Sequence, residues 1–539
     1  MSARALMILG TASHVGKSVL TAALGRILSD EGYRVAPFKA QNMSLNSAAT
    51  PDGCEIGRAQ ALQAEACRVP PSAEMNPILI KPSSDTDAQV VVLGRVWGQV
   101  SAADYHQRRV EELFPLVLES YRKLADEYEV VLIEGAGSPA EINLKEHDIV
   151  NLRMARAANA SCLLVGDIDH GGVFASLLGT VELLEPYERA LIRGFAINKF
   201  RGDLELLRPG IAMIEERLHL PCAGVIPYLH DVGLEEEDSV AVEDWRTVGR
   251  AWDTLMPNQE SPDRPLRIGV VAFPHLANFT DFDALANEPS VSLAFLVRAG
   301  DVASADVLIL PGSKQTLQDL AWLEQRGFCV AISKFRERAA AKRAGIIGIC
   351  GGMQMMGNLI DDPNGAENAG KRISAHGLSL LPIATVLNTD KITRRVRGTL
   401  LTSKLFGAPV ADRSFHGYEI HLGETIYEET AQPFSEIIRK DSNSAVWDGA
   451  ISSDAFVFGT YVHGLFDDDN FRHAFLTAAR SMCRLAPPLR KAFFNAERQQ
   501  RINRLADHVR RALDMHLIEE WLQLSGSGKL SLHDLVSHQ

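Results

Sequence analysis

The chain has 539 residues, more than a single hydrophobic core usually serves, so we expect two or more domains. A formal net charge of −13 without a long basic run excludes a typical nucleic-acid-binding protein. No apolar stretch is long enough for a membrane span or a signal-peptide core, and the seven cysteines lack metal-ligand or redox spacing. These features predict a cytoplasmic, soluble protein with reduced thiols and no membrane partner.

Short apolar runs alternate with helical patterns over residues 1–233, which predicts a parallel β-sheet covered by helices. Strands are expected at residues 5–9, 35–39, 130–134, 162–166, 194–198 and 223–226. In open α/β sheets, ligands bind beyond the carboxyl ends of the strands. The polar residues that follow these runs are therefore candidates for a functional site.

A phosphate-binding loop is predicted at residues 10–18, between the first strand and a helix. In this sequence, Gly-Thr-Ala-Ser-His-Val-Gly-Lys-Ser, backbone N–H groups would cradle phosphates, Lys17 would meet the β- and γ-phosphates and Ser18 would ligate Mg²⁺. Five residues, not the usual four, separate Gly10 from Gly16, and this spacing resembles the loop of the dethiobiotin synthetase-like ATPases. The predicted ATP-binding residues of the loop are Gly10, Thr11, Gly16, Lys17 and Ser18.

Polar residues at two further strand ends suit the same site. Glu134 ends the apolar run 130–134, and a carboxylate there, opposite the phosphate loop, is suited to hold Mg²⁺ or its water. The alternative is a strand-end glutamate that faces solvent. Asn198 and Lys199 follow another predicted strand. Either they bind the nucleotide near its base, or they form a simple turn.

The composition changes after the first domain. Residues 234–265 are acidic, then polar and proline-containing, which predicts a linker between domains. A second α/β unit is expected over residues 266–485, and residues 486–539 have the pattern of a charged helical tail without identifiable chemistry. The strands expected early in the second unit lie at residues 267–273, 307–310 and 346–349.

The second unit contains a candidate catalytic cysteine. Residues 348–354, Gly-Ile-Cys-Gly-Gly-Met-Gln, link a predicted strand to a predicted helix, so a tight turn presents Cys350 and the helix N-terminus favours its thiolate. His463, in Gly-Thr-Tyr-Val-His-Gly-Leu-Phe, is the candidate base. A Cys-Gly-Gly turn with a distant histidine resembles the class I glutamine amidotransferases, which release ammonia from glutamine. The alternative is a packed turn without a catalytic role.

That resemblance implies an oxyanion hole formed by backbone N–H groups. The candidates are Gly312, in Leu-Pro-Gly-Ser-Lys-Gln-Thr, and Gly351. Class I glutaminases usually place a glutamate two residues after the histidine, but this position is Leu465 here. The orienting carboxylate is therefore missing from its usual place, which favours a Cys–His dyad but leaves open whether another carboxylate orients His463. Glu419 is either a substitute carboxylate or a residue of the strand that lines the glutamine pocket.

Nearly the whole chain resembles the cobyric acid synthase family, the glutamine-dependent amidases of cobalamin biosynthesis. The segments that carry this resemblance are residues 38–46 (Phe-Lys-Ala-Gln-Asn-Met-Ser-Leu-Asn), 55–63, 134–141, 166–174, 198–203 and 417–421. The sibling family of cobyrinic acid a,c-diamide synthases carries a Lys-x-Gly-Pro-Asp-Tyr-Ile-Asp type segment in place of residues 39–46. The resemblance implies a P-loop dethiobiotin synthetase-like parallel-sheet domain followed by a class I glutamine amidotransferase-like α/β domain.

The resemblance also implies a function. The family amidates the b, d, e and g carboxylates of adenosylcobyrinic acid a,c-diamide, with ATP, Mg²⁺ and glutamine as the ammonia donor. A polyanionic corrinoid needs hydrogen-bond donors, and the candidate substrate-binding residues are Lys39, Gln41, Asn42, Asn46, Arg58 and Gln63. Alternatively, these residues form a polar loop and an amphipathic helix. The other functions left open are another ATP-dependent glutamine amidotransferase, such as the a,c-diamide synthase, and a P-loop regulatory protein with a decayed glutaminase domain.

Overall fold

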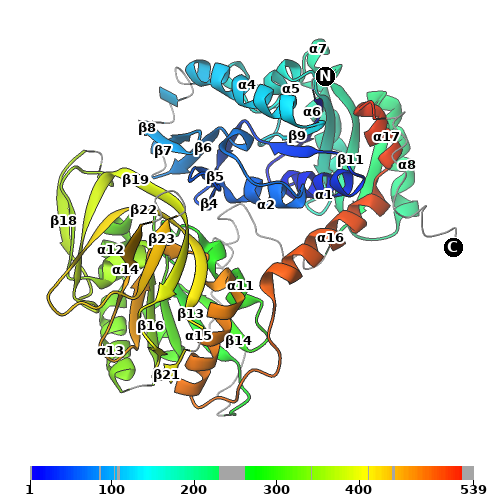
Figure 1. Ribbon diagram of the computed structural model, residues 1–539. Helices are drawn as coiled ribbons and strands as arrows, with labels where there is room; N and C mark the ends of the chain where they lie inside the picture. The colour runs from blue at the N-terminus through cyan, green and yellow to red at the C-terminus, as the bar shows by residue number, and fades with distance from the viewer. Residues whose placement is uncertain are drawn as a thin grey trace.

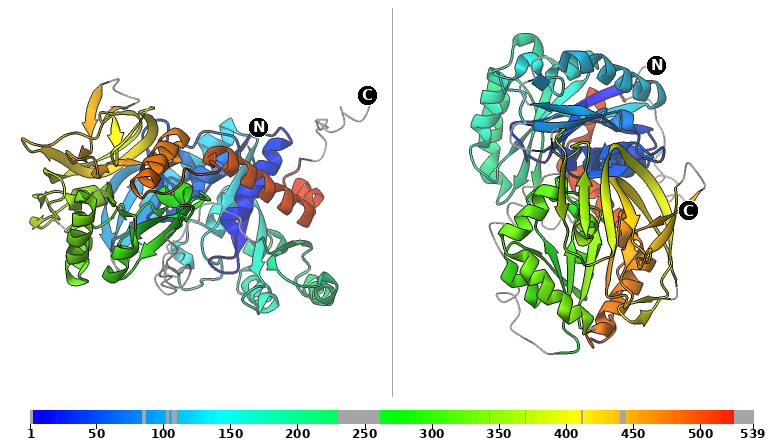
Figure 2. Two further views of the ribbon diagram at one scale, coloured as in Figure 1. Left: turned by 90° about the horizontal axis from the view of Figure 1, so that it is seen from below. Right: turned by 90° about the vertical axis from the view of Figure 1, so that its left-hand side faces the viewer.

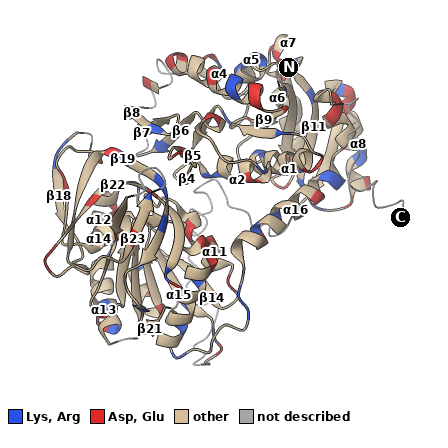
Figure 3. Cartoon of the chain, in the orientation of Figure 1, with Lys and Arg blue, Asp and Glu red and all other residues tan. Residues whose placement is uncertain are grey.

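The computed structural model describes residues 3–83, 87–101, 104–105, 110–229, 261–341, 343–368, 370–410, 412–439 and 444–524. The described residues form two α/β lobes, and the last helices return from the second lobe to the first (Figure 1). Most of the predicted linker, 234–265, lies outside the described residues. In Figure 3, acidic and basic positions are interspersed over both lobes.

The first lobe is built on a parallel sheet, as predicted. Its six strands among the described residues run in the order β12-β11-β10-β1-β9-β2, and every neighbouring pair is parallel. The strands are β1 (Arg4–Gly10), β2 (Val35–Phe38), β9 (Val130–Glu134), β10 (Ser161–Asp167), β11 (Ile192–Phe200) and β12 (Cys222–Pro227). All six predicted strands are confirmed.

Helices cover both faces of this sheet, which explains the continuous apolar runs. Along β1, Met7 and Leu9 enter the core on one face, and Leu6 and Ile8 enter the core on the other. The helices on the first face are α4 (Val110–Glu127), α5 (Leu152–Ala157), α6 (Val173–Glu182) and α8 (Leu204–Leu218). Those on the second face are α1 (Lys17–Asp30), α16 (Phe494–Ala512) and α17 (Met515–Trp521).

A small insertion after β2 separates the main sheet from the second lobe (Figure 1). Strand β3 pairs in parallel with β6, which continues antiparallel into β7 and β8, and β4 pairs with β5 as a hairpin that leads into α2. The elements are β3 (Gln41–Met43), β4 (Ser47–Ala49), β5 (Glu55–Gly57), α2 (Arg58–Ala66), β6 (Ile78–Pro82), β7 (Asp87–Val92) and β8 (Arg95–Ser101). The candidate substrate residues all lie in or beside this insertion.

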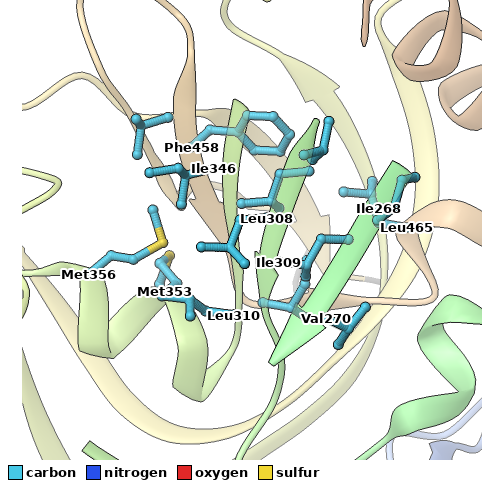
Figure 4. Close-up of a cluster of buried hydrophobic side chains, with 14 of the residues drawn as sticks. Ile268, Val270, Leu308, Ile309, Leu310, Ile346, Met353, Met356, Phe458 and Leu465 are labelled. Carbon is cyan, nitrogen blue, oxygen red and sulfur yellow. The ribbon is translucent and has the colours of Figure 1, made fainter. Parts of the chain in front are cut away.

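The second lobe contains a mostly parallel sheet in the order β14-β13-β15-β16-β26-β25. Figure 4 shows part of its core, a cluster that contains side chains of these strands together with Met353 and Met356 of α14 (Gly351–Met356). The strands are β13 (Leu266–Val271), β14 (Val291–Leu296), β15 (Val307–Leu310), β16 (Gly345–Ile349), β25 (Ala450–Ile451) and β26 (Val457–Thr460). The other helices are α11 (Asp283–Ala286), α12 (Thr316–Gln325), α13 (Phe328–Ala340) and α15 (Asp469–Met482).

A second, mainly antiparallel sheet of this lobe lies toward the first lobe. Its central pair is β19 (Ile383–Leu400) with β22 (Ser414–Tyr427), and β22 also pairs with β27 (Val462–His463). The remaining strands are β17 (Leu359–Asp362), β18 (Ile373–His376), β23 (Ser435–Arg439) and β24 (Ala445–Asp448). Strand β27 thereby delivers His463 to the edge of the sheet.

The described part of the predicted tail, residues 486–524, contains two helices and packs onto the first lobe, whereas residues 525–539 lie outside the described residues. Figure 2 shows α16 crossing from the second lobe to lie along α1. Leu505 and Val509 of α16 share a core with Leu20 and Leu24 of α1, and Trp521 of α17 belongs to the same core. The tail thus completes one face of a domain that begins nearly 500 residues earlier in the chain.

Candidate active sites

The predicted phosphate loop connects β1 to α1 and is held by its own lysine. Lys17 begins α1, and its Nζ donates to the carbonyl of Ala12 at 2.9 Å and to that of Gly137 at 3.1 Å. Gly16 has a φ of 99°, a conformation that favours glycine. A Cβ at Gly10 would lie 2.9 Å from the backbone carbonyl oxygen of Ala12. Both glycines are therefore required by the local geometry.

Glu134 lies beside this loop with a buried carboxylate. Its Oε1 accepts a hydrogen bond from Ser18 Oγ at 2.7 Å and pairs with Lys39 Nζ at 2.9 Å. Its Oε2 accepts from Gln63 Nε2 at 2.5 Å. Burial opposes ionisation, but the Lys39 charge and these hydrogen bonds outweigh burial and lower the pKa of Glu134. The alternative of a solvent-facing glutamate is wrong, because its side chain is only 1% exposed.

The oxygens of Ser18 and Glu134 are suited to Mg²⁺. Mg²⁺ prefers oxygen ligands and typically takes one or two from protein, with phosphates and water completing its shell. The 2.7 Å separation of Ser18 Oγ and Glu134 Oε1 places a hydroxyl and an ionised carboxylate together at the phosphate loop. Among the described residues, no group of three or more His, Cys, Asp or Glu side chains could hold a metal by itself.

Asn198 and Lys199, at the end of β11, contact the phosphate loop. Asn198 Nδ2 donates to the carbonyl of Val15 at 2.8 Å. Lys199 Nζ donates to the carbonyl of His14 at 2.7 Å and pairs with Asp167 at 2.9 Å. These bonds brace the loop from a neighbouring strand. A contact with the nucleotide base stays a prediction.

The six candidate substrate-binding residues do not form one cluster, because they contact different parts of the molecule. Lys39 and Gln63 bind the Glu134 carboxylate, as described above. Asn42 is buried and donates to Gln60 Oε1 at 2.8 Å, whereas the partly exposed Gln41 accepts from the hydroxyl of Tyr105 at 2.5 Å. Much of this set therefore holds the insertion together.

The other two candidates lie at the boundary with the second lobe. Asn46 Oδ1 accepts a hydrogen bond from the backbone N–H of Phe279 at 3.1 Å. Arg58 forms an ion pair with Asp467 at 3.5 Å. Both partners belong to the second lobe, so these residues bridge the two halves of the molecule. A corrinoid-binding role for any of the six stays a prediction.

Cys350 occupies a tight turn between β16 and α14, as predicted. Its φ is 50°, which is unusual for a residue other than glycine. A Cβ at Gly351 would lie 2.9 Å from the backbone nitrogen of Ser313, and a Cβ at Gly352 would collide with the carbonyl of Leu310. The glycines thus allow the turn to sit against the loop after β15 with the cysteine held in a strained conformation.

His463 is oriented by Asp281, a residue that the sequence analysis missed. Asp281 Oδ2 lies 2.6 Å from His463 Nδ1, and its Oδ1 accepts from the backbone N–H of Gly464 at 2.9 Å. The side chains form a Cys350–His463–Asp281 triad, so the predicted dyad is wrong. Glu419 does not substitute, because it binds Arg439 at 2.8 Å.

The electrostatics of the triad favour a protonated histidine. Burial lowers the pKa of His463, but the Asp281 carboxylate and the hydrogen bond and charge of Cys350 outweigh burial and raise it to about 10. The imidazole is therefore positively charged at neutral pH. A cysteine beside an imidazolium is the arrangement that supports a thiolate nucleophile.

Gly312 and Gly351 lie close to His463 and Cys350. Together with Cys350 and His463, Gly312 lines one pocket, and a Cβ at Gly312 would lie 3.2 Å from His463 Cε1. Gly351 immediately follows Cys350 as the first residue of α14. The positions suit an oxyanion hole, and that role stays a prediction.

The pocket also contains buried charges. Lys314, Glu367 and Lys391 line it from the second lobe, and Lys81 lines it from the first. Burial lowers the pKa of Lys314 to about 8 and raises that of Glu367 to about 7. Both lobes therefore shape the space beside Cys350.

Comparisons with known proteins agree with this arrangement. Residues 6–240 match a CobQ/CobB/MinD/ParA nucleotide binding domain, and residues 267–471 match a CobB/CobQ-like glutamine amidotransferase domain. A cobyric acid synthase of Moorella thermoacetica is 46% identical over 95% of this chain and 96% of its own. One from Nitratidesulfovibrio vulgaris is 44% identical over 97% and 98%. The chain belongs to the cobyric acid synthase family.

The two matched domains, a nucleotide-binding domain and a glutamine amidotransferase domain, correspond to the two lobes of the structure. Among solved structures, PurLQS from Thermotoga maritima is 17% identical with a TM-score of 0.30, over 39% of this chain and 98% of that one. No helix among the described ranges is long and apolar enough to cross a bilayer.

Proposed function

We propose that this member of the cobyric acid synthase family amidates the b, d, e and g carboxylates of adenosylcobyrinic acid a,c-diamide, using ATP and glutamine. The observation that carries the proposal is the presence of two intact centres in one chain. One is the phosphate loop with Lys17 beside the buried Glu134 carboxylate. The other is the Cys350–His463–Asp281 triad, in a pocket lined partly by the first lobe.

Glutamine hydrolysis follows from the triad. The Cys350 thiolate attacks the amide carbon, and N–H groups at Gly312 and Gly351 stabilise the negative oxygen. The protonated His463 gives its proton to the leaving nitrogen, so ammonia departs and a glutamyl thioester remains. Neutral His463 then accepts a proton from the water that hydrolyses the thioester. Asp281 holds Nδ1 throughout, which leaves the other ring nitrogen for these transfers.

The charged groups of the pocket match the free ends of glutamine. The ammonium group of Lys314 suits its α-carboxylate, and the carboxyl group of Glu367 suits its α-amino group. A buried site of mixed charge would favour a zwitterion over a singly charged amide.

The phosphate loop serves the second reaction. A carboxylate does not react with ammonia until a better leaving group replaces its oxygen. Transfer of the γ-phosphoryl group of ATP produces an acyl phosphate, and ammonia then displaces inorganic phosphate to give the amide. Lys17 and the loop N–H groups offset the charge of the phosphates. Ser18 and Glu134 would hold Mg²⁺, which supplies further positive charge at the phosphates.

The two lobes meet where ammonia is released. Lys81 of β6 lines the pocket of Cys350, and Lys314 Nζ donates to Gln89 Oε1 of β7 at 3.1 Å. Ammonia formed beside Cys350 thus faces the first lobe. This arrangement supports transfer between the centres without protonation in bulk water.

The substitution Cys350→Ser tests the division of labour. A serine hydroxyl is almost fully protonated at neutral pH and is a poor nucleophile, so glutamine-dependent amidation should be lost. Amidation with high ammonium salt at mildly alkaline pH should stay near the wild-type rate, because the first lobe needs only ammonia. Mass spectrometry of the corrinoid product counts the amides that have been added.

Lys17→Ala is the matched control in the other centre. It should abolish amidation with either nitrogen donor while sparing glutaminase activity. Loss of both activities in a folded Cys350→Ser protein would contradict the two-centre mechanism. Failure of the wild type to amidate the a,c-diamide at all four positions would instead favour another carboxylate substrate.

A further inference from the structure

The first lobe forms buried hydrogen bonds to the loop of the second lobe that carries Asp281. Asn46 Oδ1 accepts from the backbone N–H of Phe279 at 3.1 Å, and Asn278 Oδ1 accepts from the backbone N–H of Ser47 at 3.0 Å. These four residues are all buried, and Asn46 is only 1% exposed. Breaking the contact would leave polar groups unsatisfied inside the protein, so the contact is strongly held.

The loop of residues 278–281 contains Asp281 and contacts His463 of the triad. Asn278 has a φ of 53° and precedes the 3₁₀ turn η4 (Phe279–Phe282), which contains Asp281. Asn278 Nδ2 lies 3.4 Å from His463 Nδ1, the nitrogen that Asp281 contacts at 2.6 Å. One side of the loop therefore meets the catalytic histidine, and the other side meets the first lobe.

We propose that Asn46 and Ser47 are positioning residues of the glutaminase centre, although they belong to the nucleotide-binding lobe. By holding residues 278–281, they fix Asp281 and thereby orient His463 toward Cys350. This inference rests on the proposed glutaminase function and extends it, because the triad by itself lies wholly in the second lobe. It also gives Asn46 a role other than substrate binding.

The same segment of the first lobe contacts both centres. It begins at Lys39, which pairs with Glu134 beside the phosphate loop, and reaches Ser47 at the Asp281 loop. Strand β3 lies between these points and pairs with β6, so the segment is anchored in a sheet. Docking of the first lobe is thus a structural condition for a complete glutaminase triad.

The test is Asn46→Ala in the full chain, assayed as glutamate release without ATP or corrinoid. We expect kcat to fall about tenfold or more while the KM for glutamine changes little, because a buried hydrogen bond behind the triad is lost. We also expect the pH profile of Cys350 alkylation by iodoacetamide to shift to higher pH, because a less firmly protonated His463 supports the Cys350 thiolate less well. A loosened Asp281 stabilises the protonated form of His463 less well, so the pKa of that histidine should fall.

Three comparisons make the outcome decisive. Gln499→Ala removes the hydrogen bonds to Arg26 and Glu65 that attach α16 to the first lobe. This variant should change neither kcat nor the alkylation profile. Asn46→Asp keeps an acceptor oxygen for Phe279 and should retain most of the activity, which also covers the case of an alanine variant that fails to fold. Asn46→Ala combined with Asp281→Asn should lose less than the product of the single effects.

Normal kcat and an unchanged alkylation profile in Asn46→Ala, with only a lower melting temperature, would overturn the inference. Fully multiplicative effects with Asp281→Asn, or an inactive but folded Asn46→Asp, would overturn it as well. Absence of glutaminase activity from the wild type would instead contradict the proposed function.

Discussion

The carboxylate that orients His463 comes from a residue 182 positions earlier in the chain. The position where class I glutaminases usually have a glutamate is Leu465, which is buried in the hydrophobic core of the second lobe. A carboxylate could not replace this leucine without losing apolar packing. Asp281 reaches the imidazole from the loop after β13 and also fixes the backbone of Gly464.

Asp281→Asn should reduce glutaminase kcat by about 10²- to 10⁴-fold, because the amide has the shape of the carboxylate but not its charge. The pKa of His463 should fall from its raised value of about 10. A histidine with a raised pKa stabilises the fold below its ordinary value of about 6.5, and this contribution is lost as the pH rises through about 10. The substitution should therefore lower stability most at neutral and acidic pH, as measured by urea denaturation across pH.

Amidation with ammonium salt is the control for this variant, because the first lobe does not use Asp281. It should continue near the wild-type rate. An Asp281→Asn enzyme with full glutamine-dependent activity would remove the aspartate from the mechanism.

Some helices of this protein pack against the lobe that is more distant from them in the sequence. Helix α16 follows the glutaminase lobe in the chain but packs along α1, the helix that begins with Lys17 of the phosphate loop. The exposed face of α16 is charged, whereas Ile502, Leu505 and Val509 are buried. The described part of the tail therefore packs against the helix that carries the phosphate loop.

Leu505→Ala should destabilise the first lobe by about 2–5 kcal/mol, the cost of a cavity at a fully packed leucine. Urea denaturation followed by loss of ATP-dependent amidation should show the change. Glutaminase activity should be lost in the same transition, because the first lobe holds the loop that carries Asp281. Asn503→Ala, at an exposed position of the same helix, is the matched control and should change stability little. Glutaminase activity that persists to much higher urea than amidation in Leu505→Ala would argue that the triad does not depend on the docked first lobe.

The two lobes are joined by buried charges as well as by hydrogen bonds. Glu55 of β5 pairs with Lys81 at 2.7 Å within the first lobe and with Lys391 of β19 at 2.6 Å across the interface. Burial opposes ionisation of Glu55, but the two lysines outweigh burial and lower its pKa. This cluster adjoins the pocket of Cys350, so the contact between lobes and the glutaminase centre share residues.

Glu55→Gln should destabilise the protein by about 3–5 kcal/mol at neutral pH, because it leaves buried lysines without a counter-charge. The pKa of Glu55 is lowered, so its contribution is present above the ordinary value of 4.5 and is lost as the pH falls below that value. The difference in unfolding free energy between wild type and variant should shrink accordingly in acid. The ratio of amide formed to glutamate released should also fall, since the lobes are held less firmly.

Adding Lys391→Met to Glu55→Gln should restore part of the stability by removing one uncompensated charge. No recovery in the double variant would indicate that Lys391 does not contribute to the penalty. An unchanged amide-to-glutamate ratio in Glu55→Gln would show that ammonia transfer does not depend on this contact between the lobes.

The sequence by itself determined the parts of this protein that depend on neighbouring residues. The parallel strands, the turn at Cys350 and the strand–loop–helix around Lys17 each have a local signature, because burial and backbone geometry act within a few residues. Only the tertiary structure decided that Asp281 completes the triad, that Asn46 faces the second lobe and that α16 belongs to the first. A single buried aspartate or asparagine has no periodic pattern, and its partner depends on which distant strand ends the topology brings together.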